Sequence, residues 1–447
     1  MSASTRAGRA AAALARYWSA DDPDAVFLQD LLDRMSAARL RRTPRAGPPR
    51  RVLLLGYAGA GNTGADLRTI ETILQLRRHA PGVHIDLYAL GPLFDHPVLA
   101  ATPKLKPGLR YVPDVLDAAM AHYDLVLDVE GSTYTSTFSD SLAGTLLGGL
   151  GLAAAHGARA IAYGVDSGRM STALAAFARS TAEGVTVIAR NDAARAQLAG
   201  LGIAALAGAD PGWRYRDAGA AGGLAGAART VAICPSNAFW WPAVSDVARA
   251  ARLDASGQAC PWRYGAFHFH SWDSERAERY ERYLDEQARL VEGLARRGLV
   301  PVLVGMDRLD AAACADVAAR VAPALAPQIV VRGDASLDAV LQTLTRAAGV
   351  VTTRFHAALV GLSHGLPVFG LALDERIERL LVDAGSASWW ADAGSPRWAT
   401  RVLCAFDDIF ADAAGRAALR ARHLAFAARQ VAAFDAMALQ LPAGEEP

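Results

Sequence analysis

The amino-acid sequence predicts an α/β protein built from two Rossmann-like, doubly wound lobes with a cleft between them. Three observations predict this fold class. The chain has 447 residues, which is too long for one ordinary hydrophobic core. Apolar runs of strand length alternate with amphipathic helical segments, as in parallel sheets covered by helices. This alternation stops at a small-residue linker, 218–228, and restarts at Thr230.

The expected organisation has four parts. Residues 1–49 form a helical extension and linker, because the apolar residues at 27, 28, 31 and 32 fall at helical spacing and prolines follow them. Residues 50–228 form an N-terminal Rossmann-like domain, and residues 229–400 form a C-terminal one. Residues 401–447 form C-terminal helices that could cross back to the first lobe.

The first lobe opens with the unbroken apolar run 51–55, which is typical of a parallel strand covered on both faces. A glycine-rich turn and a helix over 65–79 follow. The pattern then predicts strands at 84–90, 125–129, 160–165 and 185–189, and helices at 142–155, 170–183 and 192–198. We expect Asp192 to cap the last of these helices.

The second lobe repeats the same rhythm after the linker. Its predicted strands are 230–234, 300–304, 329–331, 349–353 and 367–371. Its predicted helices are 273–296, 311–322, 337–348 and 356–365, with further helices from Arg376 onward.

The composition excludes several function classes. A formal net charge of +1 gives no electrostatic reason to expect nucleic acid or an anionic membrane as a partner. The 4 cysteines are scattered without a CxxC pair, so neither a zinc site nor a disulfide framework is expected. The most apolar run, 142–155, is too short to span a bilayer, and the N-terminus does not resemble a signal peptide. We expect a cytoplasmic protein, and the alanine-rich, lysine-poor usage is typical of a GC-rich bacterial genome.

Ligands of open parallel sheets collect where strands end, so loops that directly follow strands are the candidate sites. The first such loop, Gly56–Asp66, carries Gly59, Asn62, Thr63 and Asp66 as candidate binding residues. Its glycines allow close backbone approach, and its polar side chains can contact a bound oxygen. It matches neither the dinucleotide fingerprint nor a Walker A loop, and a purely structural turn is the alternative.

Polar side chains also follow the strand at 125–129. Glu130, Ser132 and Thr133 begin a hydroxyl-rich run that could line a polar acceptor site. The alternative is a solvated loop whose hydroxyls act only as caps.

An arginine and a histidine mark the junction between the strand at 349–353 and its helix. Arg354 can bind a phosphate or carboxylate with two hydrogen bonds, and His356 can act as an acid or base near neutral pH. Both would share the positive end of the helix. We therefore expect them to be catalytic.

The first strand of the second lobe leads into Ser236 and Asn237, followed by an aromatic insert over 238–273. Within the insert, His268 and His270 alternate as on an extended segment, so their side chains project together. Substrate contact is one interpretation, and packing of core or lid is the other. A metal is not expected, because no third ligand lies at a suitable spacing.

These segments, taken in order, resemble the polysaccharide pyruvyl transferase family. The strongest match is Thr353-Arg354-Phe355-His356-Ala357 with Gly365-Leu366-Pro367-Val368. The loop Gly56–Asp66 is similar to that family's G-x-x-G-x-x-N-x-G-D signature. Further matches are 124–128 with Glu130-Gly131-Ser132, Arg190-Asn191-Asp192, Ala209-Asp210-Pro211 and Asp374-Glu375-Arg376. These add Arg190 and Asp374 to the candidate binding residues.

The resemblance implies a GT-B-like fold and transfer of a pyruvyl or enolpyruvyl group from phosphoenolpyruvate to an acceptor, with release of phosphate. His356 would protonate the enol methylene, and Arg354 would hold the phosphate or carboxylate of the donor. This chemistry requires no cofactor and no metal. The alternatives are a nucleotide-sugar glycosyltransferase of the same architecture and a non-catalytic binding protein.

The sequence departs from the family pattern at three places. Cys234-Pro235-Ser236-Asn237 stands where family members tend to carry an arginine, and Glu130-Gly131-Ser132 stands where they carry three glycines. The aromatic insert is the third. These departures leave open whether the acceptor is a sugar hydroxyl or a small molecule, and whether the product is a ketal or an enolpyruvyl compound. The sequence does not specify the oligomeric state.

Overall fold

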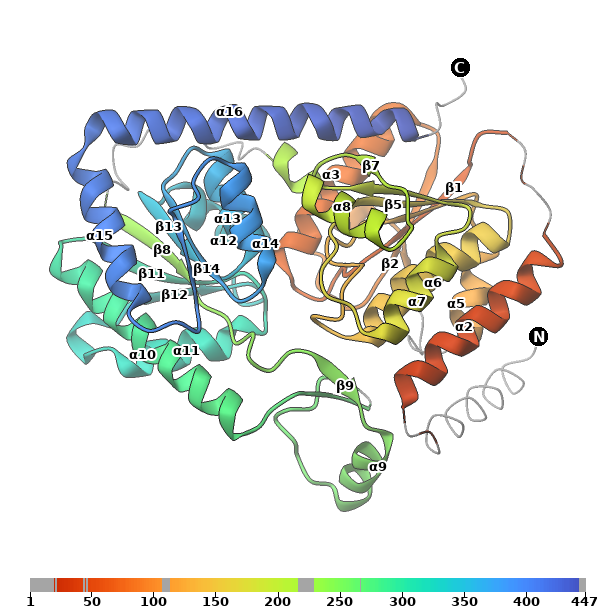
Figure 1. The fold of residues 1–447 in the computed structure, drawn as a ribbon, viewed down its shortest axis with the longest axis horizontal. Helices are drawn as coiled ribbons and strands as arrows, with labels where there is room; N and C mark the ends of the chain where they lie inside the picture. Colours follow the sequence, from red (N-terminus) through yellow and green to blue (C-terminus); the bar gives the residue numbers. More distant parts are fainter. Residues whose placement is uncertain are drawn as a thin grey trace.

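The computed structural model describes residues 20, 22–42, 45, 47–106, 113–215, 229–265 and 267–441. Within these ranges the chain forms two α/β lobes with a long helix across the top of both (Figure 1). Each lobe contains one parallel sheet with helices packed on it, so the predicted fold class is confirmed. The predicted linker 218–228 and most of the predicted N-terminal extension before residue 22 lie outside the described residues.

The first lobe holds a seven-stranded sheet in the order β3-β2-β1-β4-β5-β6-β7, with every pair parallel. Its strands are β1 Arg51–Leu55, β2 His84–Tyr88, β3 Lys104–Leu105, β4 Leu125–Asp128, β5 Arg159–Val165, β6 Val185–Ala189 and β7 Leu206–Ala207. Its helices are α3 Thr63–His79, α4 Pro97–Ala101, α5 Pro113–Met120, α6 Asp140–Ala155, α7 Thr172–Thr181 and α8 Asp192–Gly200, followed by the short 3-10 turn Pro211–Arg214.

The second lobe holds a six-stranded parallel sheet in the order β12-β11-β8-β13-β14-β15. Its strands are β8 Thr230–Cys234, β11 Val300–Gly305, β12 Gln328–Val331, β13 Gly349–Thr352, β14 Val368–Ala372 and β15 Trp390–Asp392. Its helices are α10 Ser274–Arg296, α11 Asp310–Arg320, α12 Leu337–Thr345, α13 Phe355–Ser363, α14 Glu375–Asp383 and α15 Trp398–Ala411.

The two sheets have the same kind of strand order. In each lobe the first strand lies in the interior of the sheet, and the strand order reverses beside it. In the first lobe the reversal falls between β1 and β4, and in the second between β8 and β13. Ligands of such sheets bind outside the carboxyl ends of the strands at this point. The four loops selected from the sequence are those that follow these four strands. The topology therefore places all four candidate loops at the reversal points of the two sheets.

The described part of the N-terminal extension is the helix α2, Pro23–Arg39, which packs on α6 of the first lobe. Glycines on α6 make the close approach possible. A Cβ atom added at Gly144 would lie 2.4 Å from the Leu28 side chain, and one at Gly148 would lie 2.7 Å from Leu31. The apolar, glycine-rich run that the sequence places here is therefore a buried helix between α2 and the sheet. Among the described residues, no helix is long and apolar enough to cross a membrane.

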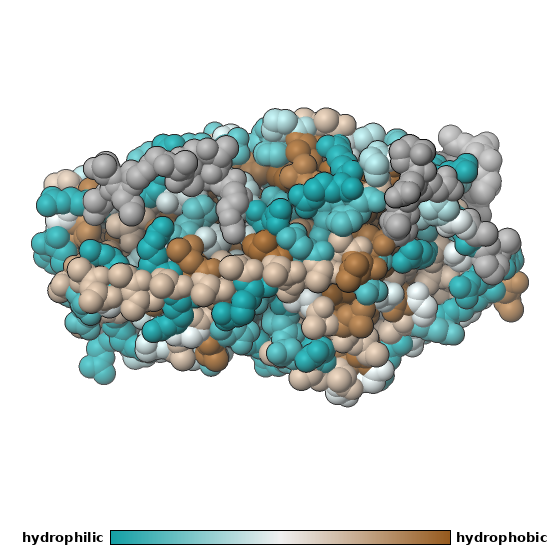
Figure 2. Space-filling view, turned by 90° about the horizontal axis from the view of Figure 1, so that it is seen from above, coloured by the Kyte–Doolittle hydropathy of each residue, from teal (hydrophilic) through white to brown (hydrophobic). Residues whose placement is uncertain are grey.

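The helix α16, Ala413–Met437, runs from the second lobe across to the first (Figure 1). Figure 2 looks onto this face, where exposed alanines of α16 form a pale brown band beside hydrophilic residues. At its far end the backbone oxygen of Phe434 accepts a hydrogen bond of 2.9 Å from Gln75 of the first lobe. Near its middle, buried His423 bonds to Leu366 and Ser386 of the second lobe. The helix thus ties the lobes together.

Buried polar contacts also join the lobes beneath α16. The Thr63 amide donates to the Met306 carbonyl at 2.8 Å. The guanidinium of Arg332, on the second lobe, bonds to Asp66 at 2.9 Å and to Asp95 at 2.6 Å, both on the first lobe. Arg332 and Asp66 are both fully buried. Burial raises the pKa of Asp66 to about 7, although Arg332 opposes the shift.

The structure corrects some local expectations. The cap of α8 is the Asn191 side chain, which accepts from the Ala194 amide, and Asp192 is the first helical residue instead. The insert after β8 contains the antiparallel strands β9 Ala243–Ser245 and β10 His268–His270 and the helix α9 Val247–Ser256; of these, the pattern indicated only the extended segment at His268 and His270. These segments are only 3 to 10 residues long and carry weak periodicity.

His423 makes the stability of this fold sensitive to acid. Burial lowers the pKa of His423 to about 4, so below pH 6.5 the unfolded chain binds a proton that the folded chain does not. The contribution of neutral His423 to the free energy of unfolding is therefore fully present above pH 6.5 and is lost as the pH falls towards 4. We expect the His423→Gln variant to lose less stability than the wild type over this range, by a few kcal/mol at pH 4. Urea unfolding at several pH values measures this, with exposed His79→Gln as the control. Parallel pH profiles for wild type and His423→Gln would contradict the expectation.

Candidate active site

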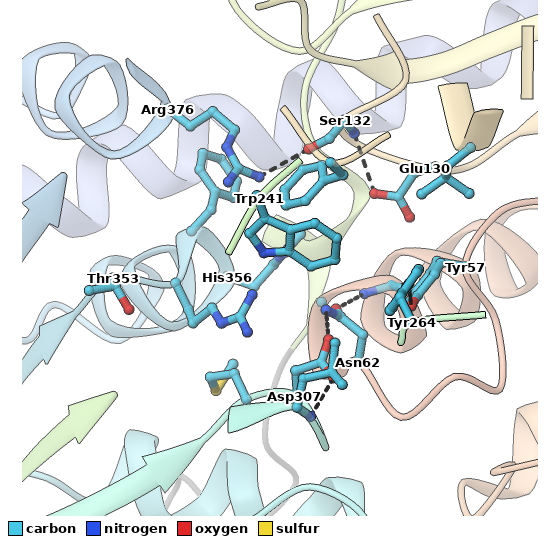
Figure 3. A pocket seen from close by; sticks show the side chains of 18 of the residues that line it. Tyr57, Asn62, Glu130, Ser132, Trp241, Tyr264, Asp307, Thr353, His356 and Arg376 are labelled. Atoms are coloured by element: carbon cyan, nitrogen blue, oxygen red, sulfur yellow. Dashed lines mark hydrogen bonds between the residues drawn. The ribbon is translucent and has the colours of Figure 1, made fainter. Parts of the chain in front are cut away.

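A cleft lies between the lobes where the loops after β1, β4 and β13 meet, and its empty volume is about 880 Å³ with the solvent at its mouth included. Side chains from both lobes and from the insert converge on it (Figure 3). The basic side chains of its lining are Arg190, Arg354, Arg376 and His356. Its acidic lining consists of Glu130 and Asp307.

Arg354 is held on the lining by a buried carboxylate. It lies between β13 and α13, and its Nε donates to Asp310 at 3.0 Å while Nη2 donates to the other oxygen of the same carboxylate. Asp310 is fully buried, and burial raises its pKa to about 6 against the opposing effect of Arg354. The pair fixes the plane of the guanidinium. The third nitrogen, Nη1, has no hydrogen-bond partner within the ranges that the structure describes, so it is available to a ligand.

The N-terminus of α13 opens onto the cleft without a side-chain cap. Asn62 caps α3, Ser336 caps α12 and Asp374 caps α14, but at α13 the capping position is Arg354, whose side chain makes no such bond. Both Phe355 and His356, in the first turn, line the cleft. An uncapped helix N-terminus presents backbone N–H groups and a positive partial charge, which favours an anion.

His356 lies over the glycine loop of the first lobe. A Cβ atom at Gly64 would fall 2.0 Å from Nδ1 of the imidazole, so only glycine fits beneath the ring. The other ring nitrogen, Nε2, is 3.5 Å from the Asp210 carboxylate. The arrangement holds the ring between the backbone of one lobe and a buried acid, with 16% of the side chain exposed to the cleft.

Asp210 is surrounded by basic side chains. Besides His356, it contacts fully buried Arg68 and, at 3.1 Å, Arg190. Burial alone would raise the pKa of Asp210, but Arg68, His356 and Arg190 hold it well below its usual range. Arg190 is further fixed by Asp166 at 3.0 Å and lies 3.7 Å from the centre of the Phe355 ring. Asp210 is therefore a permanent anion behind the imidazole.

Arg376 reaches across from the second lobe to the loop after β4. Its Nε and Nη2 donate to Asp374 at 2.9 and 2.5 Å, and Nη1 donates to the Ser132 hydroxyl at 3.0 Å (Figure 3). Asp374 also caps α14. Burial opposes ionisation of Asp374, but Arg376 lowers its pKa overall. The third arginine of the cleft is thus positioned by residues of both lobes.

Two acidic groups line the side of the cleft nearer the first lobe. Asn62 donates to Asp307 at 2.7 Å and accepts from the Ala65 amide at 3.0 Å, so it caps α3 and joins the lobes at once. Oε1 of Glu130 accepts from the amides of Gly131 at 2.9 Å and Ser132 at 3.3 Å. Oε2 of Glu130 is buried and has no hydrogen-bond partner within the described chain.

Aromatic side chains complete the lining. Tyr57 follows β1, Phe138 belongs to the loop after β4, and Trp241 and Tyr264 come from the insert of the second lobe. The Tyr57 and Tyr264 hydroxyls are hydrogen-bonded to each other across the lobes. The Trp241 ring contacts Phe138 and Tyr264 edge-to-face, at centroid distances of 5.2 and 5.5 Å.

Six of the residues expected from the sequence line this cleft, and they come from four separate segments. They are Asn62, Glu130, Ser132, Arg190, Arg354 and His356. The structure brings these together because each follows a strand whose carboxyl end faces the other lobe.

The remaining candidates lie behind the lining. Gly59 has φ +78° and packs against Phe94, and Thr63 and Asp66 are buried in α3. Thr133 donates to Asp128 at 2.6 Å, Ser236 is hydrogen-bonded to Thr353, Asn237 accepts from the Phe239 amide, and Asp374 holds Arg376. At Gly59, Thr63 and Asp66 the alternative of a structural turn describes the geometry better than substrate contact.

His268 and His270 do not line the cleft either. Both are buried on β10, and burial lowers the pKa of each to about 4. His270 stacks on Trp240 at 4.2 Å and lies 4.9 Å from Trp241. Their projection to one side was expected, but that side faces the aromatic core of the insert. His270 therefore contacts Trp241, which lines the cleft, and neither histidine is placed to contact a ligand there.

Arg376, Asp307, Tyr57, Trp241 and Tyr264 are lining residues that sequence reasoning did not select. Arg376 carries a signal that could have found it, since it lies in the loop-to-helix junction that follows β14, as Arg354 does after β13. Asp307 likewise comes two residues after β11. Trp241 and Tyr264 carry no comparable signal, because the insert reaches the cleft only through tertiary packing. Within the described chain, no group of three or more His, Cys, Asp or Glu side chains is arranged to hold a metal ion.

Two Rossmann-like lobes, a shared cleft and a C-terminal helix that spans both lobes define the GT-B architecture. Solved structures of similar fold include the Anabaena HepE protein in complex with UDP-glucose, with a TM-score of 0.51 and 13% identity over 87% of this chain and 98% of that one. UDP-GlcNAc 2-epimerase from Neisseria meningitidis has a TM-score of 0.51 and 10% identity over 86% of this chain and 98% of that one. The S. aureus MnaA–UDP structure has a TM-score of 0.53 and 11% identity over 89% and 100%.

The family resemblance is more specific than the fold. Residues 178–375 match the model of the polysaccharide pyruvyl transferase family, which confirms the resemblance noted in the sequence. The matched range includes the segment of Arg190, the insert and the junction of Arg354 and His356. Comparison with curated protein sequences finds no significant match.

Proposed function

We propose that the protein transfers a pyruvyl or enolpyruvyl group from phosphoenolpyruvate to a hydroxyl of a saccharide or a related small acceptor, with release of phosphate. The observation that carries this proposal is the uncapped N-terminus of α13, which places Arg354 and His356 together on the cleft. The family match supports this reaction class. The positions of the lining residues support the role that we assign to each of them below.

The donor anion is assigned to the first turn of α13. The N-terminus of α13 has no side-chain cap, and Asp310 holds the guanidinium plane of Arg354, so little conformational freedom of this side chain is lost when an anion binds. Arg376 and Arg190 supply further positive potential on the same cleft. These arginines supply positive charge to a cleft in which the first strand of the second lobe is followed by Cys234-Pro235-Ser236-Asn237 rather than by an arginine.

The segment after β8 supports α13 instead of binding the donor. Ser236 Oγ and Thr353 Oγ1 are hydrogen-bonded at 2.8 Å, and Thr353 Oγ1 donates to the Cys234 carbonyl at 3.0 Å. Burial raises the pKa of Cys234 to about 12, so its thiol is neither a nucleophile nor an anion ligand. The substitution of the usual arginine has therefore produced a neutral hydrogen-bonded support for the Arg354 turn.

The proton is assigned to His356. A protonated imidazole would donate to the enol methylene carbon of the donor, which makes the adjacent carbon electrophilic towards an acceptor hydroxyl. Asp210, an anion at the back of the ring, stabilises the imidazolium and fixes its orientation. No cofactor and no metal are needed for this step.

Two measurements test the proposal. Phosphoenolpyruvate should raise the melting temperature of the protein, and its incubation with saccharide acceptors should release inorganic phosphate. Stabilisation by UDP-sugars without stabilisation by phosphoenolpyruvate would instead favour the nucleotide-sugar glycosyltransferase. Stabilisation by phosphoenolpyruvate with no phosphate release across a broad acceptor panel would favour a binding protein.

The Arg354→Lys variant is expected to weaken phosphoenolpyruvate binding by about tenfold or more. Lysine retains the positive charge but loses the planar fork that joins Asp310 to the donor. The measurement is the phosphoenolpyruvate concentration that gives half of the thermal shift. Arg346→Lys, an exposed arginine on α12's end in the same lobe, is the matched control. Equal phosphoenolpyruvate affinity in wild type and Arg354→Lys would remove Arg354 from the donor site.

A further inference from the structure

The insert of the second lobe is anchored on the first lobe beside the cleft. The Ala243 amide donates to the Phe138 carbonyl at 2.7 Å, and the Ser245 hydroxyl donates to Asp24 of α2. Val247 packs into the hydrophobic core of the first lobe. The insert therefore bridges the lobes at this side of the cleft, as Figure 1 shows for β9 and α9.

The insert presents a firm aromatic wall to the cleft. Trp241 contacts Phe138 and Tyr264 through ring edges, and the Tyr57–Tyr264 hydrogen bond ties the wall to the first lobe (Figure 3). Behind Trp241, His270 packs at 4.9 Å and holds the indole in place. A flat apolar surface edged by hydroxyl groups matches a pyranose ring, which has an apolar face of C–H groups and a polar rim.

Glu130 supplies the second observation. Its Oε1 is satisfied by two backbone amides, whereas Oε2 is buried on the cleft without a partner within the described chain. A buried carboxylate oxygen without a hydrogen bond is unfavourable, so a hydroxyl-bearing ligand at this place would restore the missing bond.

We infer that Glu130, Trp241 and Tyr264 form the acceptor subsite, that the acceptor is a pyranosyl unit, and that Glu130 accepts the proton of its attacking hydroxyl. The location of the subsite rests on the geometry, and the proton transfer rests on the proposed function. As the acceptor O–H bond breaks, its proton passes to Oε2 and the oxygen bonds to the donor carbon that bears the phosphate. The donor methylene gains its proton from His356. When a second acceptor hydroxyl displaces phosphate, its proton leaves with the phosphate.

Binding of simple sugars tests the subsite without the donor. The probes are methyl pyranosides of the gluco, galacto, manno and N-acetylgluco series, titrated by calorimetry and by saturation-transfer NMR. We expect at least one to bind the wild type with its C–H face saturated from aromatic protons, and Trp241→Ala to weaken that binding about tenfold or more. Trp262→Ala is the matched control, because Trp262 stacks on Trp272 within the same insert and does not line the cleft.

The proton transfer is tested by Glu130→Gln, which keeps the size of the side chain. With phosphoenolpyruvate and the bound pyranoside, we expect phosphate release to fall about 100-fold or more while the phosphoenolpyruvate-induced thermal shift is unchanged. Rates within a few-fold of the wild type would overturn the role of Glu130.

The outcomes separate this inference from the proposed function. If no pyranoside binds, or if Trp241→Ala binds as well as the wild type, the subsite is wrong even when phosphoenolpyruvate binds normally. If a pyranoside binds in a Trp241-dependent way but no phosphate is released by the wild type, the subsite stands. In that case both the proton transfer to Glu130 and the proposed function are wrong.

Discussion

Replacing His356 with alanine is expected to lower the rate of phosphate release from phosphoenolpyruvate by about 10²- to 10⁴-fold, the usual contribution of a positioned general acid. The imidazole lies between Gly64 and Asp210, with its exposed part on the cleft. The arginines of the lining cannot replace it, since they do not give up their protons near neutral pH. Steady-state release of phosphate measures the effect.

The fold of this variant should be intact, because the lost side chain is partly exposed and makes one contact of 3.5 Å to Asp210. An unchanged urea midpoint would show this. His79→Ala, at the exposed end of α3, is the control for the substitution itself. A His356→Ala protein that releases phosphate at the wild-type rate would remove the imidazole from the mechanism and with it the proposed protonation step.

Replacing Arg332 with alanine is expected to give the largest loss of stability, about 3–5 kcal/mol, because it leaves a buried carboxylate without its counter-ion. Arg332 and Asp66 are both fully buried at the contact between the lobes, and Asp95 shares the same guanidinium. In the variant, Asp66 has to remain protonated to stay buried, so its pKa should rise further above 7. The urea midpoint of unfolding measures the loss.

Two further variants make this expectation specific. Arg297→Ala removes an arginine whose ion pair with Asp407 is exposed, and it should cost about 0–1 kcal/mol. The double variant Arg332→Met with Asp66→Asn removes both buried charges, and it should recover part of the stability lost in Arg332→Ala. If Arg332→Ala cost no more than Arg297→Ala, the contact between the lobes would not depend on this bridge.

Both the loss of activity in His356→Ala and the loss of stability in Arg332→Ala depend on a contact between residues more than 140 positions apart, and local sequence patterns do not reveal such contacts. The junction Arg354–His356 could be predicted as a site, because it combines a strand end, a helix start and two functional side chains in one local segment. Its partners Asp310 and Asp210 could not be predicted. Asp210 lies in one of the motifs that resemble the family, but neither aspartate carries a local sign of its partner, and only the winding of the two sheets brings each beside Arg354 or His356.

The aromatic insert is a case in which the residues could be identified from the sequence but their surroundings could not. Its tryptophans and histidines were visible in the sequence, but alternation along β10 could not distinguish a side facing substrate from a side facing Trp240 and Trp241. The structure places His270 against those two rings and leaves Trp241 itself on the cleft. Local spacing determines which side chains project together, whereas packing determines what they project towards.

The sequence by itself determined two parallel sheets of matching rhythm and the strand-end loops from which the cleft is built, since strand, turn and helix patterns are local properties of the chain. It also determined the family resemblance, which depends on the order of short motifs. Only the tertiary structure decided which polar residues line the cleft and which are buried behind it. That choice depends on how Asp66, Asp210 and Asp310 pair with arginines from distant segments, and a buried charge is stable only where such a partner is held beside it.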